Sequence, residues 1–478
     1  MSQEIPTVQD GHILSSFDCQ PFGTVLQPLI REAVMECGLT TVRKGTKLPP
    51  VFVIWIVLMF VIRRDLNGRK VLNWMLSGWR WFEGSLPASA TLISQGALSH
   101  ARKRVGVAVF QAILPKLHRP HGRLSPDFHG RISGAFDGGT GTMPDTPSNR
   151  ETWGKPGSRG RAAAFPQLRF MSLLIVSTRT IWDLACAPYR GKRTGERALM
   201  RRILDRLSDV VLLVLLDAGL YSFEMVWTLH QHGHDVIVKV PNTVKLSMMT
   251  RLPDGSFLTQ IMGSLEDVSR PPSPAGRCHW MTKVVTVRAM RVRIPGYRPW
   301  TLVTTMLDAA IPATEIAGHY HRRWDIEIAY DELKTHQCAT LRGQSPTTFR
   351  SKCGELVEQE LYAMVIMYTT IRLIMVQAAL TSGGTPRDLS FLETLHLVLE
   401  AAPFMTLHDE ARQVIVFEFL LETIATAIIL RSPQKRIAPR VVKVAHAKFP
   451  RKRDTDVVTI QDRANTVKIL ERREKSAS

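Results

Sequence analysis

The sequence predicts an α/β core, a mixed sheet with helices, that is interrupted by a β-rich insertion and flanked by helical N-terminal and C-terminal regions. Short apolar runs alternate with amphipathic helical patterns between residues 126 and 240. Strand-like and loop-rich sequence follows, and helix-compatible patterns fill most of the remainder. A chain of 478 residues that is 45% hydrophobic has apolar side chains enough for several cores.

We expect five regions along the chain. They are a helical N-terminal region (1–125), a first part of the α/β core (126–240), a β-rich insertion (241–305), a second part of the core (306–380), and a helical, basic C-terminal region (381–478).

The N-terminal region contains three helix-compatible stretches: 24–37, 48–62 and 88–109. The last follows Pro87, a residue favoured at helix starts, and carries Arg102, Lys103 and Arg104. These cations predict a basic face that holds DNA phosphates, and an ordinary solvated surface is the alternative. The apolar run 48–62 is shorter than the roughly 20 residues of a membrane span, so we expect a buried helix and no membrane partner.

The core begins with a short apolar run, 131–136, that ends in Asp137. Two strands follow within 168–188, then a helix over 195–208 and an apolar strand, 210–216, that ends in Asp217. A helix (221–230) and a strand (234–240) complete this part. In open α/β sheets, functional sites lie beyond the carboxyl ends of strands.

The insertion is marked by prolines at 271, 272 and 274 and by a hairpin-like run over 283–294. A helix over 312–336 should follow, with Pro312 in its first turn. Further helices are expected over 355–377, 389–400 and 409–430. The segment 431–453 holds nine basic and no acidic residues, which suits contact with DNA or a solubilising tail.

The formal net charge is +20, with an isoelectric point near 10. Such an excess of Lys and Arg is typical of proteins that bind a polyanion, although a basic enzyme of another kind has the same charge. The six cysteines are scattered without metal-site spacing. This usage suits reduced thiols in the cytoplasm.

The most informative stretch runs from Tyr320 to Lys334. At about 100° per residue, Tyr320, Arg323, Glu327 and Lys334 fall within roughly a 60° arc of one helix. A carboxylate between a hydroxyl and two cations can bind a metal beside a phosphodiester. The alternative is a common i,i+4 Arg–Glu pair on an amphipathic helix.

Two aspartates complete the candidate site. Asp137 and Asp217 each follow an apolar strand, where an Asp is also a common turn or cap residue. Together with Glu327 they supply three carboxylates in a basic protein. Two divalent ions about 3.5–4 Å apart can catalyse in-line displacement at phosphorus, and hard oxygen ligands suit Mg²⁺ or Mn²⁺.

At these residues the chain resembles the DDE transposases of bacterial insertion sequences, in the subgroup with the signature Tyr-x2-Arg-x3-Glu-x6-Lys. The signature is met by Tyr320, Arg323, Glu327 and Lys334. The stretch from Asp137 to Asn149 is similar to the family's Asp-Gly…Pro-Asp-Thr-Pro-x-Asn, and Asp217 begins a stretch similar to its Asp-x-Gly-[aromatic]-Tyr-Ser. Position 218 is Ala and position 220 is Leu, where the family commonly has a basic and an aromatic residue.

The resemblance implies a ribonuclease-H-like core whose catalytic and metal-binding residues are Asp137, Asp217 and Glu327, with two Mg²⁺ or Mn²⁺ ions. It implies that Tyr320, Arg323 and Lys334 contact DNA phosphates. Trp300 and Trp324 match the family's base-stacking aromatics in placement, and ordinary core packing is the alternative for each.

The resemblance also implies the reaction and the partners. The enzyme would cut the terminal inverted repeats of its element, by cut-and-paste through a hairpin, and join their 3′-OH groups to target DNA. It would act as a homodimer in the bacterial cytoplasm, associated with the nucleoid. The alternatives are a ribonuclease-H-like nuclease without strand transfer and an inactive DNA-binding relic.

Overall fold

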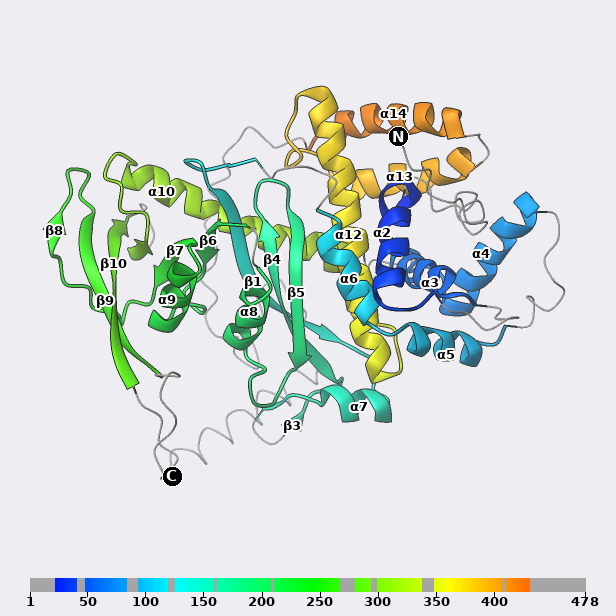
Figure 1. Cartoon of the computed structure of the whole chain (residues 1–478), viewed down its shortest axis with the longest axis horizontal. Coiled ribbons are helices and arrows are strands. Elements are labelled where there is room, and N and C mark those ends of the chain that lie inside the picture. The colour runs from blue at the N-terminus through cyan, green and yellow to red at the C-terminus, as the bar shows by residue number, and fades with distance from the viewer. Residues whose placement is uncertain are drawn as a thin grey trace, which may run out of the picture. The chain divides into compact units, whose positions relative to one another are not determined.

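The computed structural model describes ten stretches of the chain: 22–40, 48–83, 93–118, 125–158, 161–207, 210–266, 280–293, 299–337, 348–406 and 410–429. All of them belong to one compact unit, Met1–Ile429 (Figure 1). The basic segment 431–453 lies outside the described residues, so its predicted contact with DNA stays a prediction.

A nine-stranded mixed sheet organises this unit, in the order β5-β4-β1-β6-β7-β11-β10-β9-β8. The predicted α/β core is confirmed by the parallel pairs β1–β6 and β6–β7, beside which β4 and β5 run antiparallel. The strands of this part are β1 (Ile132–Thr142), β4 (Gln167–Ile175), β5 (Thr180–Pro188), β6 (Leu212–Leu216) and β7 (Asp235–Val240).

Helices cover both faces of the sheet. On one face, Phe136 and Val214 pack with apolar residues of α8 (Glu196–Leu204) and α9 (Phe223–Gln231). On the other face, Ala135 and Leu215 pack in a larger cluster that includes the helices between 313 and 382. Neighbouring strand residues point to opposite faces, and β6 is apolar and buried on both, as expected for a strand inside a parallel sheet.

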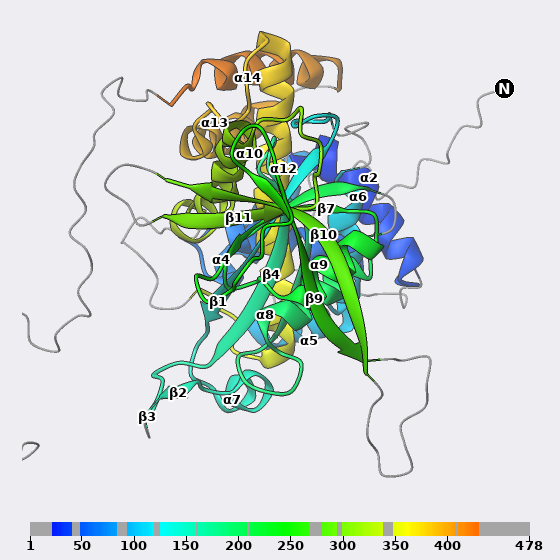
Figure 2. The ribbon, with the colours of Figure 1, turned by 90° about the vertical axis from the view of Figure 1, so that its left-hand side faces the viewer.

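The strands between 241 and 305 continue the same sheet. β11 (Trp300–Thr304) pairs antiparallel with β7, and the long strands β9 (Phe257–Glu266) and β10 (Trp280–Val292) pair antiparallel beyond it. The short strand β8 (Thr250–Arg251) forms the edge. Figure 2, viewed from this end, shows the strong twist that the long strands add.

The N-terminal part is helical, with α2 (Phe22–Glu36), α3 (Pro50–Ile62), α4 (Gly68–Glu83), α5 (Gln95–Val105) and α6 (Ala108–Lys116). The sequence did not predict α4. The single helix expected over 88–109 is wrong: α5 begins after the cap Ser94, whose hydroxyl accepts from Ala97 N, and ends at Gly106. Gly106 has φ +73°, a left-handed backbone that a glycine adopts without strain and that separates α5 from α6.

The helix expected over 312–336 is a helical stretch of four parts. It comprises α10 (Ala313–Tyr320), a 3₁₀ turn (His321–Trp324), α11 (Asp325–Asp331) and a π-helical turn (Glu332–His336). A uniform 100° step therefore does not hold from Tyr320 to Lys334, and the predicted 60° arc is wrong in detail. Helix segments with 3₁₀ or π geometry inside a longer helical stretch often occur at functional sites.

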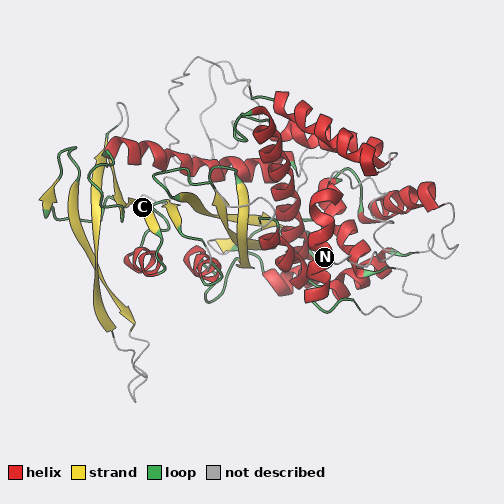
Figure 3. Cartoon of the chain, turned by 45° about the horizontal axis from the view of Figure 1, so that its top comes forward, coloured by secondary structure: helices red, strands yellow, loops and turns green. Residues whose placement is uncertain are grey.

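The longest described helix is α12 (Gly354–Ser382), which contacts α3, α6, β5 and α14. It is the one helix among the described residues that is long and apolar enough to cross a membrane, and 83% of its most apolar window is buried inside the protein. Figure 3 shows it among the other helices, with α13 (Phe391–Thr406) and α14 (Glu410–Thr426) packed beside it.

Candidate active site

Both aspartates lie on the sheet face that α10, α11 and α12 cover. Asp137 is two residues after Ala135 in β1, and Asp217 is two residues after Leu215 at the end of β6. Alternate strand residues point to the same side, so both carboxylates face this helical layer. The sheet places them on adjacent strands, because β1 and β6 are paired in parallel.

Asp137 does not end its strand, as the sequence predicted, but lies in the middle of β1. The strand continues because Gly138, Gly139 and Gly141 allow close packing rather than a turn. A Cβ on Gly139 would lie 2.4 Å from the ring of Phe170, and one on Gly141 would lie 2.2 Å from the ring of Phe349. The glycines therefore let two aromatic rings lie against the strand beside Asp137.

Asp217 follows β6 directly, as predicted, and begins a turn. Its Oδ1 accepts a hydrogen bond of 3.0 Å from Leu220 N. Arg197 Nη2 donates to the carbonyl oxygens of Gly219 and Tyr221 and so holds the far side of the turn. Leu220 is buried in the core next to α8 and α9. An apolar side chain fits this place, so Leu220 is accommodated where the family commonly has an aromatic residue.

Glu327 lies in the first turn of α11, and its carboxylate pairs with Arg323, with 2.9 Å between Arg323 Nη2 and Glu327 Oε1. The Glu327 side chain is 40% exposed, whereas that of Arg323 is 11% exposed. The pair holds the guanidinium against a carboxylate that remains open to solvent.

Electrostatics connect the three acids. The pKa of Asp137 is raised to about 6, chiefly by burial and also by the negative charges of Asp217 and Glu327, while Gly138 N and the Arg323 guanidinium act in the opposite direction. Asp217 and Glu327 are therefore near enough to act on the same carboxyl group. Such mutual repulsion is what a bound divalent cation would relieve.

The donor chemistry of these acids fits a divalent ion, since carboxylate oxygens are the ligands that Mg²⁺ and Mn²⁺ prefer. Within the described residues, no three His, Cys, Asp or Glu side chains are already gathered closely enough to hold a metal ion. In this geometry Glu327 is instead neutralised by Arg323.

The other signature residues surround this site. The Tyr320 hydroxyl is buried and donates to Leu216 O at 2.9 Å, and burial raises its pKa to about 12. Lys334 Nζ lies 5.2 Å from the ring centres of both Phe170 and Tyr330. Contacts of these two side chains with DNA remain predictions.

The two candidate stacking tryptophans differ in exposure. Trp300 is half-buried, with its ring centre 5.7 Å from that of Tyr320 and Lys239 Nζ 5.4 Å away. Trp324 is 47% exposed, and the Arg323 guanidinium lies over its ring at 5.4 Å. Trp324 is thus the more accessible of the two for a ligand.

Sequence reasoning gave no role to two acids beside Glu327. Asp325 is buried and binds Arg179 at 2.7 Å and Arg387 at 2.7 Å. Glu332 is buried and pairs with Arg372. Internal ion pairs neutralise both carboxylates, so in this geometry neither is free to bind a ligand.

Sequence reasoning also missed Tyr330. Its hydroxyl donates to Asp137 O at 2.6 Å and lies 2.8 Å from Ser172 Oγ. The one signal in the sequence is its spacing, three residues after Glu327 and so on the same side of α11.

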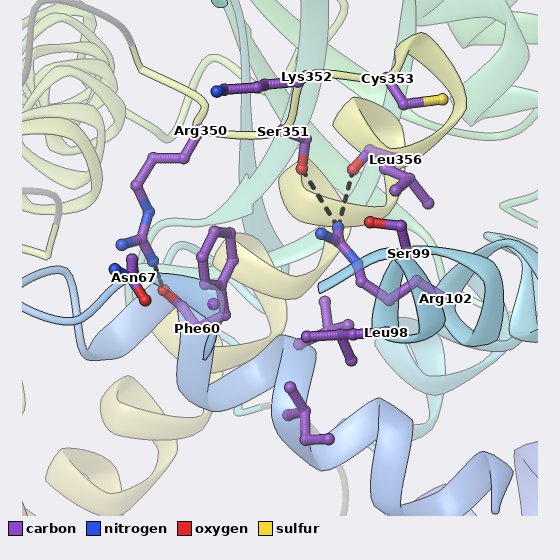
Figure 4. Close-up of a pocket in the computed structure, with 14 residues that line it drawn as sticks. Phe60, Asn67, Leu98, Ser99, Arg102, Arg350, Ser351, Lys352, Cys353 and Leu356 are labelled. Atoms are coloured by element: carbon purple, nitrogen blue, oxygen red, sulfur yellow. Dashed lines mark hydrogen bonds between the residues drawn. The ribbon is translucent and has the colours of Figure 1, made fainter. Parts of the chain in front are cut away.

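A separate cavity of about 590 Å³ lies between α3, α5 and the start of α12. Arg102 lines it but is buried, and its guanidinium donates to Ser351 Oγ and Leu356 O (Figure 4). The expectation that Arg102 belongs to an exposed basic face is therefore wrong. Arg350 lies over the Phe60 ring at 3.6 Å, and the exposed Lys352 is at the rim. None of the described residues that line this cavity is acidic.

Comparisons with known proteins match both helical and sheet-containing parts. The family model described as insertion element 4 transposase N-terminal matches residues 22–114, and the transposase DDE domain matches residues 134–370. The transposase InsG for insertion sequence element IS4 of Escherichia coli (strain K12) is 26% identical over 439 residues, 90% of this chain and 92% of that protein.

Two further similarities were found. The putative transposase InsZ of Escherichia coli (strain K12) is 30% identical over 197 residues, 40% of this chain and 61% of that protein. The solved synaptic complex of piggyBac transposase with hairpin DNA aligns with a TM-score of 0.42 and 10% identity, over 91% of this chain and 89% of that chain.

Proposed function

Because the chain belongs to the insertion-sequence DNA transposases with a DDE domain, we propose that Asp137, Asp217 and Glu327 are its catalytic metal ligands. The observation that carries this proposal is geometric: the sheet holds both aspartates on the face that α11, the helix of Glu327, covers. Two of the acids come from adjacent parallel strands and the third from the helical layer that faces them.

We infer that these carboxylates hold two divalent ions, Mg²⁺ or Mn²⁺. When bound, such ions stabilise the attacking and leaving oxygens of an in-line displacement at phosphorus. The protein's contribution is to hold the three carboxylates on one face of the sheet and to keep Asp325 and Glu332 occupied elsewhere.

Arg323 and Lys334 would hold phosphate oxygens on either side of the cut. Arg323 lies beside Glu327, and its planar guanidinium can donate two hydrogen bonds to one phosphate. Lys334 offers a point charge on a site bounded by the Phe170 and Tyr330 rings. A direct contact by Tyr320 would require its hydroxyl to leave Leu216 O. The exposed Trp324 and the half-buried Trp300 would stack on unpaired bases.

The reaction we propose is cleavage of the element's terminal inverted repeats and joining of their 3′-OH groups to target DNA, by cut-and-paste through a hairpin. The core would be ribonuclease-H-like, interrupted by strands β8 to β10. The N-terminal helices would bind DNA, and two copies would pair the two ends in the bacterial cytoplasm. The net charge of +20 supports DNA as the partner.

Cleavage of labelled DNA that carries the element's ends tests this proposal. The wild type should nick the ends with Mg²⁺, and pre-cut ends should be joined to a target plasmid. Asp217→Asn should abolish both reactions while DNA binding persists. Cleavage without joining would favour a nuclease, and binding without metal-dependent cleavage would favour an inactive relic.

A further inference from the structure

We propose that Tyr330 and Tyr320 are positioning residues that set the place of Glu327 relative to the two aspartates. Their hydroxyls fasten the helical stretch that carries Glu327 to the backbone beside Asp137 and beside Asp217. This inference rests on the proposed function, because it assumes that the three carboxylates act together.

Tyr330 makes the first attachment. Its hydroxyl donates 2.6 Å to the backbone oxygen of Asp137 itself, and Ser172 Oγ lies 2.8 Å away. Ser172 is the cross-strand partner of Asp137 in the β1–β4 ladder. One buried hydroxyl therefore joins α11 to both strands at the level of the first aspartate.

Tyr320 makes the second attachment. Its hydroxyl donates 2.9 Å to the backbone oxygen of Leu216, the residue directly before Asp217. Tyr320 precedes Glu327 by seven residues, and Tyr330 follows it by three. The two attachments thus bracket Glu327, and each reaches the strand of a different aspartate.

The hydroxyl groups of the two tyrosines, rather than their rings, fix the position of Glu327. Both tyrosines are 7% exposed, so the rings supply packing that a phenylalanine would preserve. The helical stretch also has an independent anchorage through the buried ion pairs of Asp325 and Glu332. Loss of one hydroxyl should therefore shift Glu327 without unfolding α11.

An orienting role for these hydroxyl groups predicts an effect on metal affinity that a purely stabilising role does not. Groups that orient metal ligands commonly affect metal affinity by about 10-fold or more when they are removed, although they do not touch the metal. A hydroxyl that served stability alone would have no such effect. Metal affinity, measured without turnover, separates the two roles.

The test compares Tyr330→Phe with Tyr362→Phe in the full-length protein. Tyr362 is an equally buried tyrosine whose hydroxyl donates 2.9 Å to Leu184 O, so its variant also loses one buried hydrogen bond to a backbone oxygen. Mn²⁺ binding is followed by electron paramagnetic resonance of the free ion. Melting temperature and DNA affinity are measured beside it.

We expect Tyr330→Phe to weaken Mn²⁺ binding about 10-fold and to raise the Mg²⁺ concentration needed for half-maximal cleavage by a similar factor. Tyr362→Phe should lower the melting temperature by about as much as Tyr330→Phe does, but it should leave Mn²⁺ binding at the wild-type level. Tyr320→Phe should weaken Mn²⁺ binding in the same direction as Tyr330→Phe.

Equal Mn²⁺ affinity in Tyr330→Phe and the wild type would overturn this inference and leave the proposed function intact. An equal loss of Mn²⁺ affinity in both Tyr330→Phe and Tyr362→Phe would also overturn it, because general loosening of the fold would then be the cause. Failure of the wild type to bind Mn²⁺ and to cleave DNA would instead refute the proposed function.

Discussion

The guanidinium of Arg323 lies 2.9 Å from the carboxylate of Glu327, one helical turn further along. The pair places a cation next to the acid that we propose as the third metal ligand. It lowers the electrostatic cost of three neighbouring carboxylates while no metal is bound. When DNA binds, a small movement of the Arg323 guanidinium would transfer it from this carboxylate to a phosphate at the same site.

Replacing Arg323 by alanine should reduce cleavage about 100-fold at saturating Mg²⁺, because a donor to the reacting phosphate is lost. Mn²⁺ binding should not weaken, since Glu327 loses a competing cation. Single-turnover cleavage measures the first effect. Arg201→Ala is the matched control and should cleave normally. Arg201 Nη2 lies 2.6 Å from Glu224 Oε1 in a surface ion pair that does not involve the three acids. Normal cleavage by Arg323→Ala would contradict the assigned role.

Asp137→Asn should change how stability depends on pH. The pKa of Asp137 is raised from 3.8 to about 6, chiefly by burial, so the folded protein holds an extra proton between these values. The wild type therefore loses stability as pH rises from about 4 to about 6, and the penalty is fully present above that range.

The asparagine variant has no such penalty. The free energy of unfolding of the variant minus that of the wild type should therefore be roughly 1–3 kcal/mol larger at pH 8 than at pH 4. Urea unfolding in the presence of EDTA measures the difference. A stability difference that does not vary with pH would contradict the raised pKa. The same variant should be inactive in cleavage.

Gly139→Ala should destabilise the protein by about 1–3 kcal/mol, because a Cβ there would lie 2.4 Å from the Phe170 ring. The displaced ring contacts Tyr330, so cleavage should fall as well. Thermal unfolding and cleavage report the two effects. Gly318→Ala should have the opposite effect on stability: it lies in α10 with open space around it, and alanine should add about 0.5–1 kcal/mol.

Lys352→Ala should weaken DNA binding and reduce the slope of log affinity against log salt by about 1, as expected for one lost phosphate contact. Lys352 is exposed at the rim of a cavity whose described lining residues include no acid. The charge-conserving Lys352→Arg should keep the wild-type slope. Fluorescence anisotropy over a salt series measures it, and an unchanged slope for Lys352→Ala would exclude this rim from the DNA path.

Much of the architecture was predictable from local patterns. The two strands within 168–188 and the apolar strand before Asp217 were found because their runs are long and end in turn residues. Asp137 was placed wrongly at a strand end, because the glycines after it resemble a turn. Their purpose is contact with Phe170 and Phe349, which lie far away in sequence.

Other features depend on distant partners in the same way. The charge of Arg102 suggested exposure, but Gln359 and Ser351 satisfy its guanidinium in the interior. The 3₁₀ and π-helical turns on either side of α11 leave no simple periodic signal. The hydrogen bond from Tyr330 to Asp137 O joins residues 193 positions apart, so no local pattern reveals it.

A crystal structure of the protein with Mn²⁺ and cleaved end DNA, in which anomalous scattering locates the manganese, would show whether the three acids bind metal together. We expect anomalous peaks bound by carboxylate oxygens of Asp137, Asp217 and Glu327, with Arg323 moved from Glu327 to a phosphate. Manganese bound at other side chains, with the three acids unliganded, would contradict it.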